Sequence, residues 1–165
     1  MPKFFVKSSD VSNGKIYISG DDFIHIKNVL RLRHGDNIIV NDGALNDYKA
    51  VIERLEDGKV IASIIDCEAN KSEPPVEVTL YQGMPKSDKM DFIIQKCVEL
   101  GVTKIVPVIT ERTVVKLGDS KDSLKKTERW RRIALEAAKQ SNRGVVPYVH
   151  EPISFKEAIT LSEDS

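Results

Sequence analysis

Cysteine is scarce in this sequence, and its scarcity excludes two kinds of site. Only Cys67 and Cys97 occur, far apart in the chain and outside any CxxC motif. Their spacing indicates neither a disulfide framework nor a zinc site, which is typical of a protein in a reducing compartment. Cys97 falls on an apolar helical stripe, where we expect a small core residue and not a metal ligand.

Long apolar runs are also missing. No run approaches the roughly 20 residues that span a membrane. The apolar start, Phe4–Val6, is too short for a signal peptide. We therefore expect a cytoplasmic protein that makes no use of a membrane.

Net charge is the third absence. Lys and Arg together number 25, as do Asp and Glu, so the formal net charge is zero. Any binding to nucleic acid therefore depends on local cationic patches, because no overall positive field exists. With 41% hydrophobic and 30% charged residues, the 165-residue chain is typical of globular proteins and fits one domain or two small ones.

Short apolar strands fill the chain as far as residue 71. Turn signals such as Asn13-Gly14 and Asp57-Gly58 separate them. Together with one predicted helix, whose apolar residues include Val29 and Leu30, they predict a small closed or nearly closed β-barrel. The predicted strands are residues 4–6, 15–18, 37–40, 48–55 and 60–66.

A basic cluster lies between this helix and the next strand. It contains Arg31, Arg33 and His34. Solvated charges beside a turn explain the cluster as well as a phosphate-binding surface does. His25 has apolar neighbours on the helix, so we expect a structural histidine there and not a catalytic one.

A polar linker at residues 68–75, with a Pro-Pro pair, divides the chain into residues 1–71 and 72–165. After it, a strand at 77–82, a helix carrying Met90, Ile94 and Cys97, and a strand at 102–109 form a βαβ unit. Such a crossover predicts a parallel sheet.

Several polar residues of this unit are candidates for a functional role. Lys86 follows the first strand, where open α/β sheets bind their ligands. Ser87 and Asp88 suit the start of the helix. Lys96 and Glu99 lie away from its apolar stripe, and an ion pair on a solvated face is the simpler interpretation of them.

A second helix is predicted from Ser123 to Asn142, with Trp130, Ala134 and Ala138 on its buried stripe. Positive charges crowd its start, against the preference of the helix dipole. Either solvation or a phosphate-binding surface accounts for them. These cations are Lys125, Lys126, Arg129, Arg131 and Arg132.

The end of the second helix brings a carboxylate, an amide and a guanidinium together. These belong to Glu136, Gln140 and Arg143. An Arg at this position also suits the negative end of the helix dipole whatever its function. A strand at 145–150 follows, and Ser154 to Glu157 have capping-box spacing for a last helix.

Three motifs point to a family. They are Pro-Lys-x-Asp-Lys-Met-Asp from Pro85, Gln-Lys-x-x-Glu-Leu-Gly-Val from Gln95, and Glu-Ala-Ala-x-Gln-Ser-x-Arg from Glu136, with Arg112 following the second α/β strand. Together they resemble the 16S ribosomal RNA uridine-N3 methyltransferases, S-adenosylmethionine-dependent enzymes of the knotted SPOUT class. Ser87 stands where Gly is common in that family.

The resemblance implies a two-domain α+β fold. A PUA-like RNA-binding β-barrel at 1–71 would precede residues 72–165, the N-terminal part of an α/β parallel-sheet SPOUT (trefoil-knot) methyltransferase domain. The implied partners are 16S ribosomal RNA or the small ribosomal subunit, with a homodimer as the assembly and no metal.

The resemblance also implies the residues of the site. Arg112 and Arg143 would be catalytic, stabilising the uracil anion that forms when the N3 proton is removed. The substrate-binding residues would be Arg31, Arg33, Lys86, Lys96, Glu99, Lys125, Lys126, Arg129, Arg132, Glu136 and Gln140.

In the family, Gly-Pro-Glu-Gly-Gly and Leu-Gly-x-x-Ile-Leu-Arg segments follow, and they build the knot and hold the cofactor. Neither segment occurs in this sequence. We therefore expect an incomplete methyltransferase domain whose main cofactor loops lie beyond Ser165. Residues 1–165 alone are expected to have an uncovered apolar sheet face, to bind S-adenosylmethionine weakly and to leave RNA unmethylated.

Two functions therefore lead. The first is methylation of uridine N3 in 16S ribosomal RNA, and the second is RNA binding without catalysis. A dinucleotide-dependent oxidoreductase is disfavoured, because no GxGxxG motif follows the first strand of the α/β unit.

Overall fold

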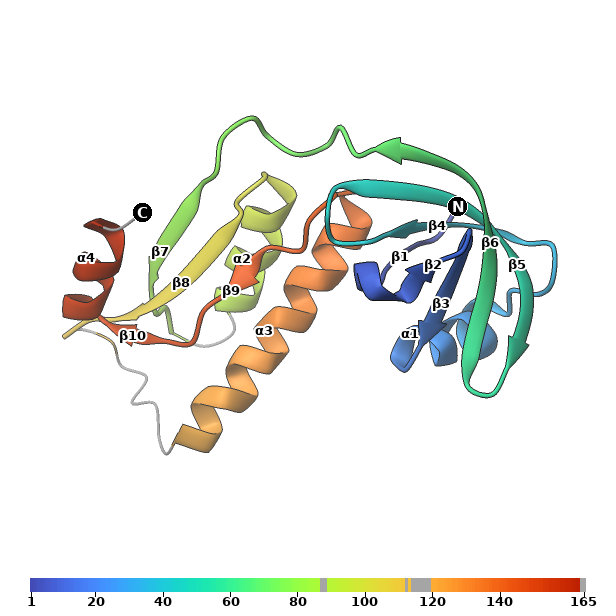
Figure 1. Ribbon diagram of the computed structural model, residues 1–165. Coiled ribbons are helices and arrows are strands. Elements are labelled where there is room, and N and C mark those ends of the chain that lie inside the picture. The colour runs from blue at the N-terminus through green and yellow to red at the C-terminus, as the bar shows by residue number, and fades with distance from the viewer. Residues whose placement is uncertain (87–88, 112, 114–119, 164–165) are drawn as a thin grey trace. The chain divides into compact units, whose positions relative to one another are not determined.

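The computed structural model describes residues 1–86, 89–111, 113 and 120–163. The chain divides into two compact units, Met1–Glu73 and Pro74–Ser165. Each unit has its own sheet and no sheet continues from one unit into the other among the described residues (Figure 1).

The first unit is a six-stranded sheet with the order β1-β4-β5-β6-β3-β2. β1 pairs with β4 in parallel, and the other pairs are antiparallel. The five predicted strands are confirmed within two or three residues at their ends, and β2 was not predicted. The strands are β1 Lys3–Phe5, β2 Val11–Ser12, β3 Lys15–Ser19, β4 Asn37–Asn41, β5 Asn46–Glu56 and β6 Lys59–Ala69.

Two tight turns follow from left-handed residue pairs. Asn13 and Gly14 have φ of 51° and 73° and join β2 to β3, while Asp57 and Gly58 have φ of 50° and 73° and join β5 to β6. Positive φ at both central residues is the type I′ pattern, whose twist matches that of the strands it joins. These two turns were correctly predicted from the sequence.

The sheet curls around a single core. Phe4 of the edge strand β1 and Ile16 of β3 belong to the same buried cluster as Val40 and Ile52 in the middle of the sheet. Two register shifts between β5 and β6 help to bend it, since bulges increase local twist. β1 and β2 do not pair among the described residues, so the curled sheet is not closed into a ring by hydrogen bonds.

The helix between β3 and β4 is present, but the prediction of its buried face is partly wrong. It consists of α1, Asp21–Ile24, continued by the π-helix η2, His25–Leu30. Ile26 is buried, but Val29 is 64% exposed, and Leu30 and His25 are also exposed. The wider π turn shifts the angular spacing on which the prediction relied, so these side chains leave the core. His25 is therefore not an interior structural histidine.

A buried polar cluster holds the connection from β4 to β5. Asp42 accepts hydrogen bonds from the backbone N–H of Ala44 (2.8 Å), from Asn46 and from the Tyr48 hydroxyl (3.2 Å). Beside it, the buried Lys3 Nζ lies 2.9 Å from a carboxylate oxygen of Asp47. A buried charge is tolerated where such partners satisfy it. A short 3-10 helix, η1 Ser8–Asp10, precedes β2.

The second unit is a parallel sheet with β8 at its centre. β7 pairs with one side of β8, and β9 and β10 pair in succession with the other side. The predicted βαβ crossover is therefore confirmed, while β10 was missed. The elements are β7 Thr79–Gly83, α2 Lys89–Glu99, β8 Lys104–Ile109, α3 Ser120–Gln140, β9 Tyr148–Val149, β10 Ile153–Ser154 and α4 Phe155–Glu163.

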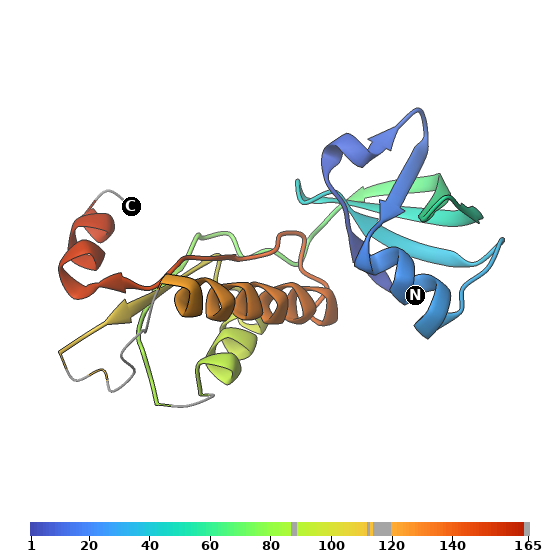
Figure 2. The ribbon, with the colours of Figure 1, turned by 90° about the horizontal axis from the view of Figure 1, so that it is seen from below.

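Helices lie on this sheet, and α2 and α3 run side by side (Figure 2). Val106 and Val108 of β8 are buried in a cluster with Ala158 of α4. Their neighbour Ile105 and its register partner Val149 are buried on the other face, where α3 contacts β9. The expectation of an uncovered apolar face is therefore wrong for β8, because α4 folds back onto it.

Candidate functional site

The predicted ligand edge of the sheet lies where β7 and β8 end. Lys86 is exposed in the loop after β7, at the carboxyl end of the strand as predicted. Arg112, Ser87 and Asp88 lie outside the described residues, so the structure gives no position for the predicted catalytic Arg112.

A hollow of about 270 Å³ lies at this edge between the strand ends and α4, and we call it the sheet-edge hollow. Its walls are mostly apolar, with Val108, Phe155 and Ile159 among them. The hydroxyl of Tyr81, also in the wall, is buried and has no hydrogen-bond partner among the described residues. A buried hydroxyl without a partner is costly, so this edge offers one polar group for a ligand.

On α2, Lys96 and Glu99 form the ion pair that their spacing suggested. Lys96 Nζ lies 2.7 Å from Glu99 Oε2, and Gln95 Nε2 donates to the other oxygen at 3.0 Å. The hydrogen bond from Lys96 is the main reason that the pKa of Glu99 is lowered. The two groups thus neutralise each other, and their role in substrate binding stays a prediction.

Five of the six predicted residues of α3 lie along one stripe of the helix, and Lys126 lies beside it. Lys125, Arg129, Arg132, Glu136 and Gln140 are spaced by three or four residues, opposite the buried Trp130 and Ala134. Arg129 forms an ion pair with Asp91 of α2. Lys125 and Lys126 have no hydrogen bond or ion pair within the described part of the chain.

Three of these predicted residues line one hollow of about 320 Å³, which we call the interhelical hollow. Arg132, Glu136 and Gln140 of α3 surround it with Gln95 of α2, over a floor that includes Ile133 and Ala137. A guanidinium, a carboxylate and two amides at the rim of an apolar floor suit a polar, planar ligand. Gln95 was part of the second motif but was not predicted as a site residue.

Arg143 occupies a different environment from these residues. It is 2% exposed, and its Nη1 donates to the backbone oxygens of Val98 (3.1 Å) and Val102 (2.6 Å). These carbonyls belong to the last turn of α2 and the residues just after it, where helix carbonyls lack intrahelical partners. Arg143 therefore joins the end of α3 to the end of α2, and its predicted catalytic role stays a prediction.

In the first unit, Arg31 and Arg33 line a hollow of about 450 Å³ at the end of η2, which we call the cationic hollow. Lys27, Asn28 and Leu32 complete its lining. All three cations are exposed, and Arg31 adopts a left-handed φ of 52°. Lys27 was not predicted from the sequence, although its place one helical turn before Arg31 could have indicated it.

Other kinds of site are not found among the described residues. No group of His, Cys, Asp and Glu there could hold a metal ion. No helix in the searched ranges is long and apolar enough to cross a membrane.

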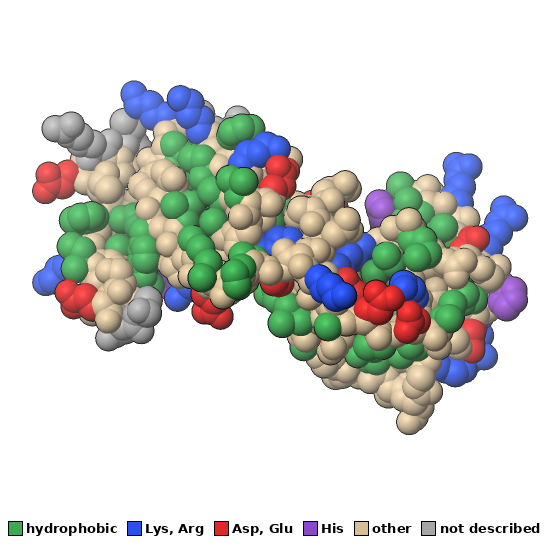
Figure 3. Space-filling view, turned by 90° about the horizontal axis from the view of Figure 1, so that it is seen from above, with side chains coloured by type: hydrophobic (Ala, Val, Ile, Leu, Met, Phe, Trp, Pro, Cys, Tyr) green, Lys and Arg blue, Asp and Glu red, His purple; other side chains and the backbone are tan. Residues whose placement is uncertain are grey.

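Hydrophobic side chains gather on the second unit in the face drawn in Figure 3.

Comparison with known families gives two matches. Residues 72–165 match the RNA methyltransferase domain, and residues 18–65 match the RNA methyltransferase PUA domain.

Among individual relatives, the chain is 39% identical over 147 residues to a ribosomal RNA small subunit methyltransferase E of Bacillus subtilis, covering 89% of this chain and 57% of the relative. A protein of the same name from Synechocystis is 37% identical over 135 residues, covering 82% of this chain and 42% of its own length. The chain therefore spans about half the length of these relatives.

Solved structures show the same similarity. The ribosomal RNA small subunit methyltransferase E of Neisseria gonorrhoeae, bound to S-adenosylmethionine, has a TM-score of 0.86 at 38% identity. A putative methyltransferase of Legionella pneumophila, also in complex with S-adenosylmethionine, has a TM-score of 0.86 at 27% identity. Each comparison covers 96% of this chain and 65% of the other.

Proposed function

Because the chain belongs to the RNA methyltransferase family, we propose that it serves in methyl transfer from S-adenosylmethionine to a uridine N3 of 16S ribosomal RNA. The match of residues 72–165 to the methyltransferase domain is the observation that carries this proposal. The relatives named for small-subunit ribosomal RNA support the substrate class, and the two solved relatives with S-adenosylmethionine support the cofactor.

The proposal assigns a part to each unit. Residues 1–71 form a PUA-like RNA-binding domain, and residues 72–165 belong to a SPOUT methyltransferase domain with a trefoil knot. The protein acts in the cytoplasm as a homodimer on 16S ribosomal RNA or the small ribosomal subunit. The cationic hollow supports RNA binding by the first unit, since exposed Arg and Lys side chains hold phosphates without reading sequence.

The chain's own residues would act mainly by position and charge. Uracil N3 is a weak nucleophile until it loses its proton, and a nearby guanidinium stabilises the resulting anion. Arg112 is our candidate for that contact. Arg143, with its guanidinium held by the carbonyls of Val98 and Val102, would act by fixing α2 against α3 and so holding the interhelical hollow in shape.

The sheet-edge hollow suits part of the cofactor. When bound, S-adenosylmethionine supplies an electrophilic methyl group on a sulfonium. Apolar walls suit the flat faces of a heteroaromatic ring, and the Tyr81 hydroxyl, which has no partner among the described residues, suits a polar atom at the ring's edge. At about 270 Å³, however, this hollow is below the usual range for whole cofactors, roughly 300–1,000 Å³.

One alternative is that the protein binds RNA without catalysis. The cations of the cationic hollow and of α3 would serve this function equally well. Measuring tritium transfer from methyl-labelled S-adenosylmethionine to 16S ribosomal RNA distinguishes the two. We expect the protein to label N3 of a uridine, and RNA binding without labelling would establish the alternative.

RNA binding itself is tested by removing charge. We expect the double variant Arg31→Ala/Arg33→Ala, and likewise Lys125→Ala/Lys126→Ala, to weaken binding of 16S ribosomal RNA. The loss should be the same for RNA of any base sequence. Each lost phosphate contact should lower the salt slope by about 0.7–0.9. If both double variants keep the affinity and the slope of the unaltered chain, the two patches are solvated surfaces. Lys59→Ala, at the exposed β5–β6 turn, is the matched control.

A further inference from the structure

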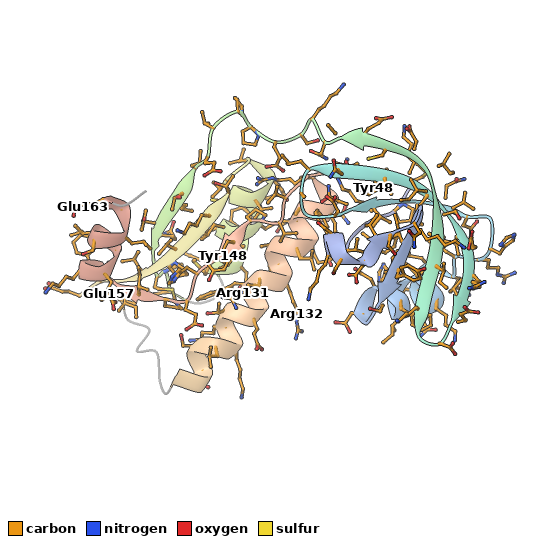
Figure 4. All side chains as sticks on the ribbon, viewed as in Figure 1. Tyr48, Arg131, Arg132, Tyr148, Glu157 and Glu163 are labelled. Atoms are coloured by element: carbon orange, nitrogen blue, oxygen red, sulfur yellow. The ribbon has the colours of Figure 1, made fainter. Side chains whose placement is uncertain are left out.

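The outer edge of β9 carries an exposed aromatic ring with a fixed guanidinium beside it. Tyr148 is 53% exposed, while its neighbour Val149 is buried. The Arg131 Cζ of α3 lies 5.6 Å from the centroid of the Tyr148 ring, and Arg131 Nε donates to the backbone oxygen of Val149 at 3.1 Å. Figure 4 labels both side chains where α3 passes β9.

Two contacts hold this arrangement in place. The His150 ring meets the Tyr148 ring edge-on, with centroids 6.0 Å apart, and its Nδ1–H donates to the backbone oxygen of Glu151 at 2.6 Å. The Nε hydrogen bond restricts the Arg131 side chain from the other side. Because both neighbours are already positioned, the exposed ring loses little side-chain freedom when a ligand stacks on it.

The same contacts disfavour an added peptide strand. Tyr148 and His150 donate their backbone N–H groups inward, to Thr103 and Ile105, so Val149 between them presents its backbone groups to the outer edge. The outward carbonyl oxygen of Val149 already accepts a hydrogen bond from Arg131 Nε. A peptide adding to this edge would have to displace that hydrogen bond, whereas a ring stacking on Tyr148 would leave it intact.

Polar and charged groups surround the ring, so a nucleotide suits this edge better than an apolar partner does. The terminal Nη groups of Arg131 have no hydrogen-bond acceptor among the described residues, and Lys104 is the register partner of Tyr148 on β8. Exposed Glu128 and Glu151 lie on the flanking segments and offset part of this positive charge. Stacking, not phosphate attraction, should therefore dominate binding here.

We propose that Tyr148 and Arg131 form a stacking platform for an unpaired base of the RNA that this protein binds. Unpaired RNA bases stack on aromatic rings and on guanidinium planes, and both are present at this edge. The inference rests on the proposed RNA-binding function but assigns a surface distinct from the cationic hollow and the α3 stripe. It predicts contact with a single-stranded segment and little contact with a duplex.

Photocrosslinking with a single-stranded hexauridylate that carries one 5-iodouridine tests the platform directly. We expect the full chain to crosslink at Tyr148, located by mass spectrometry of the peptides, and a duplex with the same strand to crosslink poorly. Tyr148→Ala should weaken binding of the oligonucleotide by roughly 5- to 150-fold, the range for losing one stacked base. Tyr148→Phe should restore most of the affinity, because the ring and not the hydroxyl stacks.

Phe92→Ala is the matched control. Phe92 is also an exposed ring with a cation beside it, but that cation, Lys96, is neutralised by Glu99. We expect this variant to keep the affinity of the unaltered chain. Circular dichroism and the melting temperature of each variant show whether the fold is intact.

Three outcomes separate this inference from the proposed function. Weakened binding in the Arg31/Arg33 variant, with normal binding in Tyr148→Ala and a crosslink elsewhere, overturns the platform alone. No RNA binding by the unaltered chain overturns both. A change in sedimentation of Tyr148→Ala without a change in RNA affinity makes this edge a protein contact and also overturns the platform.

Discussion

At the scale of single residues, the buried Arg143 shows how one side chain can join two helices. The carbonyls of Val98 and Val102 rely on its guanidinium for hydrogen bonds in the interior. We expect Arg143→Ala to lower the free energy of unfolding by at least about 2 kcal/mol, because buried acceptors would lose their donor. Denaturant unfolding measures this loss. Arg132→Ala, an exposed change on α3, should stay within about 0.5 kcal/mol.

Arg143→Lys separates structure from catalysis. Lysine keeps a cationic donor but loses the planar fork, so a moderate loss of stability is expected. If methyl transfer by this variant falls in proportion to its folded fraction, Arg143 is a positioning residue. A complete loss of transfer in a well-folded Lys variant would instead give Arg143 direct contact with the reacting base.

Asp42 makes the stability of the first unit depend on pH. Burial alone raises its pKa, but hydrogen bonds from Asn46, Ala44 and Tyr48 outweigh that effect and hold the pKa below its ordinary value of 3.8. A group with a lowered folded-state pKa stabilises the fold fully above pH of about 4, and the stabilisation is lost as pH falls through the folded-state pKa.

Asp42→Asn should therefore destabilise the first unit near neutral pH, by about 1.5–3 kcal/mol for the lost charged hydrogen bonds. The difference from the unaltered chain should shrink below pH of about 4, where the carboxyl is protonated first in the unfolded chain, and should vanish as the pH falls through the lower folded-state pKa. Urea unfolding across this pH range is the measurement. A difference that stays constant from neutral to acidic pH would contradict the assigned role of the carboxylate.

At the scale of elements, α4 depends on its first turn. Glu157 N donates to Ser154 Oγ at 3.2 Å, and Ser154 N donates to Glu157 Oε2 at 2.8 Å, which is the capping box predicted from the sequence. Hydrogen bonding of the Glu157 carboxylate to the Ser154 hydroxyl, the larger effect, and to the Ser154 backbone N–H lowers the pKa of Glu157. Because α4 covers Val106 and Val108, its capping also protects the face of β8.

We expect Ser154→Ala to destabilise α4 by about 1 kcal/mol, a typical cost for losing an N-cap. Faster hydrogen exchange at the amides of α4 is the expected observation. Ser162→Ala is the matched control at the opposite end of the helix, where the hydroxyl only donates to the oxygen of Ile159. Equal exchange in the two variants would show that the capping box contributes nothing to the helix.

At the scale of the whole molecule, the proposed homodimer is open to a direct test. Exposed hydrophobic side chains on the second unit, including Val78 and Leu100, provide surface that a second copy could cover. We expect a dimer by analytical ultracentrifugation at micromolar concentration. An active protein that sediments as a monomer would contradict the proposed homodimer.

The sequence by itself determined the local features. Asn13-Gly14 and Asp57-Gly58 determined their turns, because a left-handed φ costs Asn, Asp and Gly little free energy. Ser154 and Glu157 fixed the start of α4, and the spacing of Arg132, Glu136 and Gln140 placed them around one hollow. In each case the interacting residues are within a few positions of one another or one helical face, so the chain pattern contains the geometry.

Tertiary structure alone decided the rest. The burial of Arg143 depends on carbonyls of α2, the exposure of Val29 depends on a π turn, and the platform at Tyr148 depends on α3 passing the edge of β9. These contacts join residues far apart in the chain, or depend on a backbone irregularity that helical spacing does not reveal. Residue periodicity reports which face of an element is apolar, whereas packing decides what that face meets.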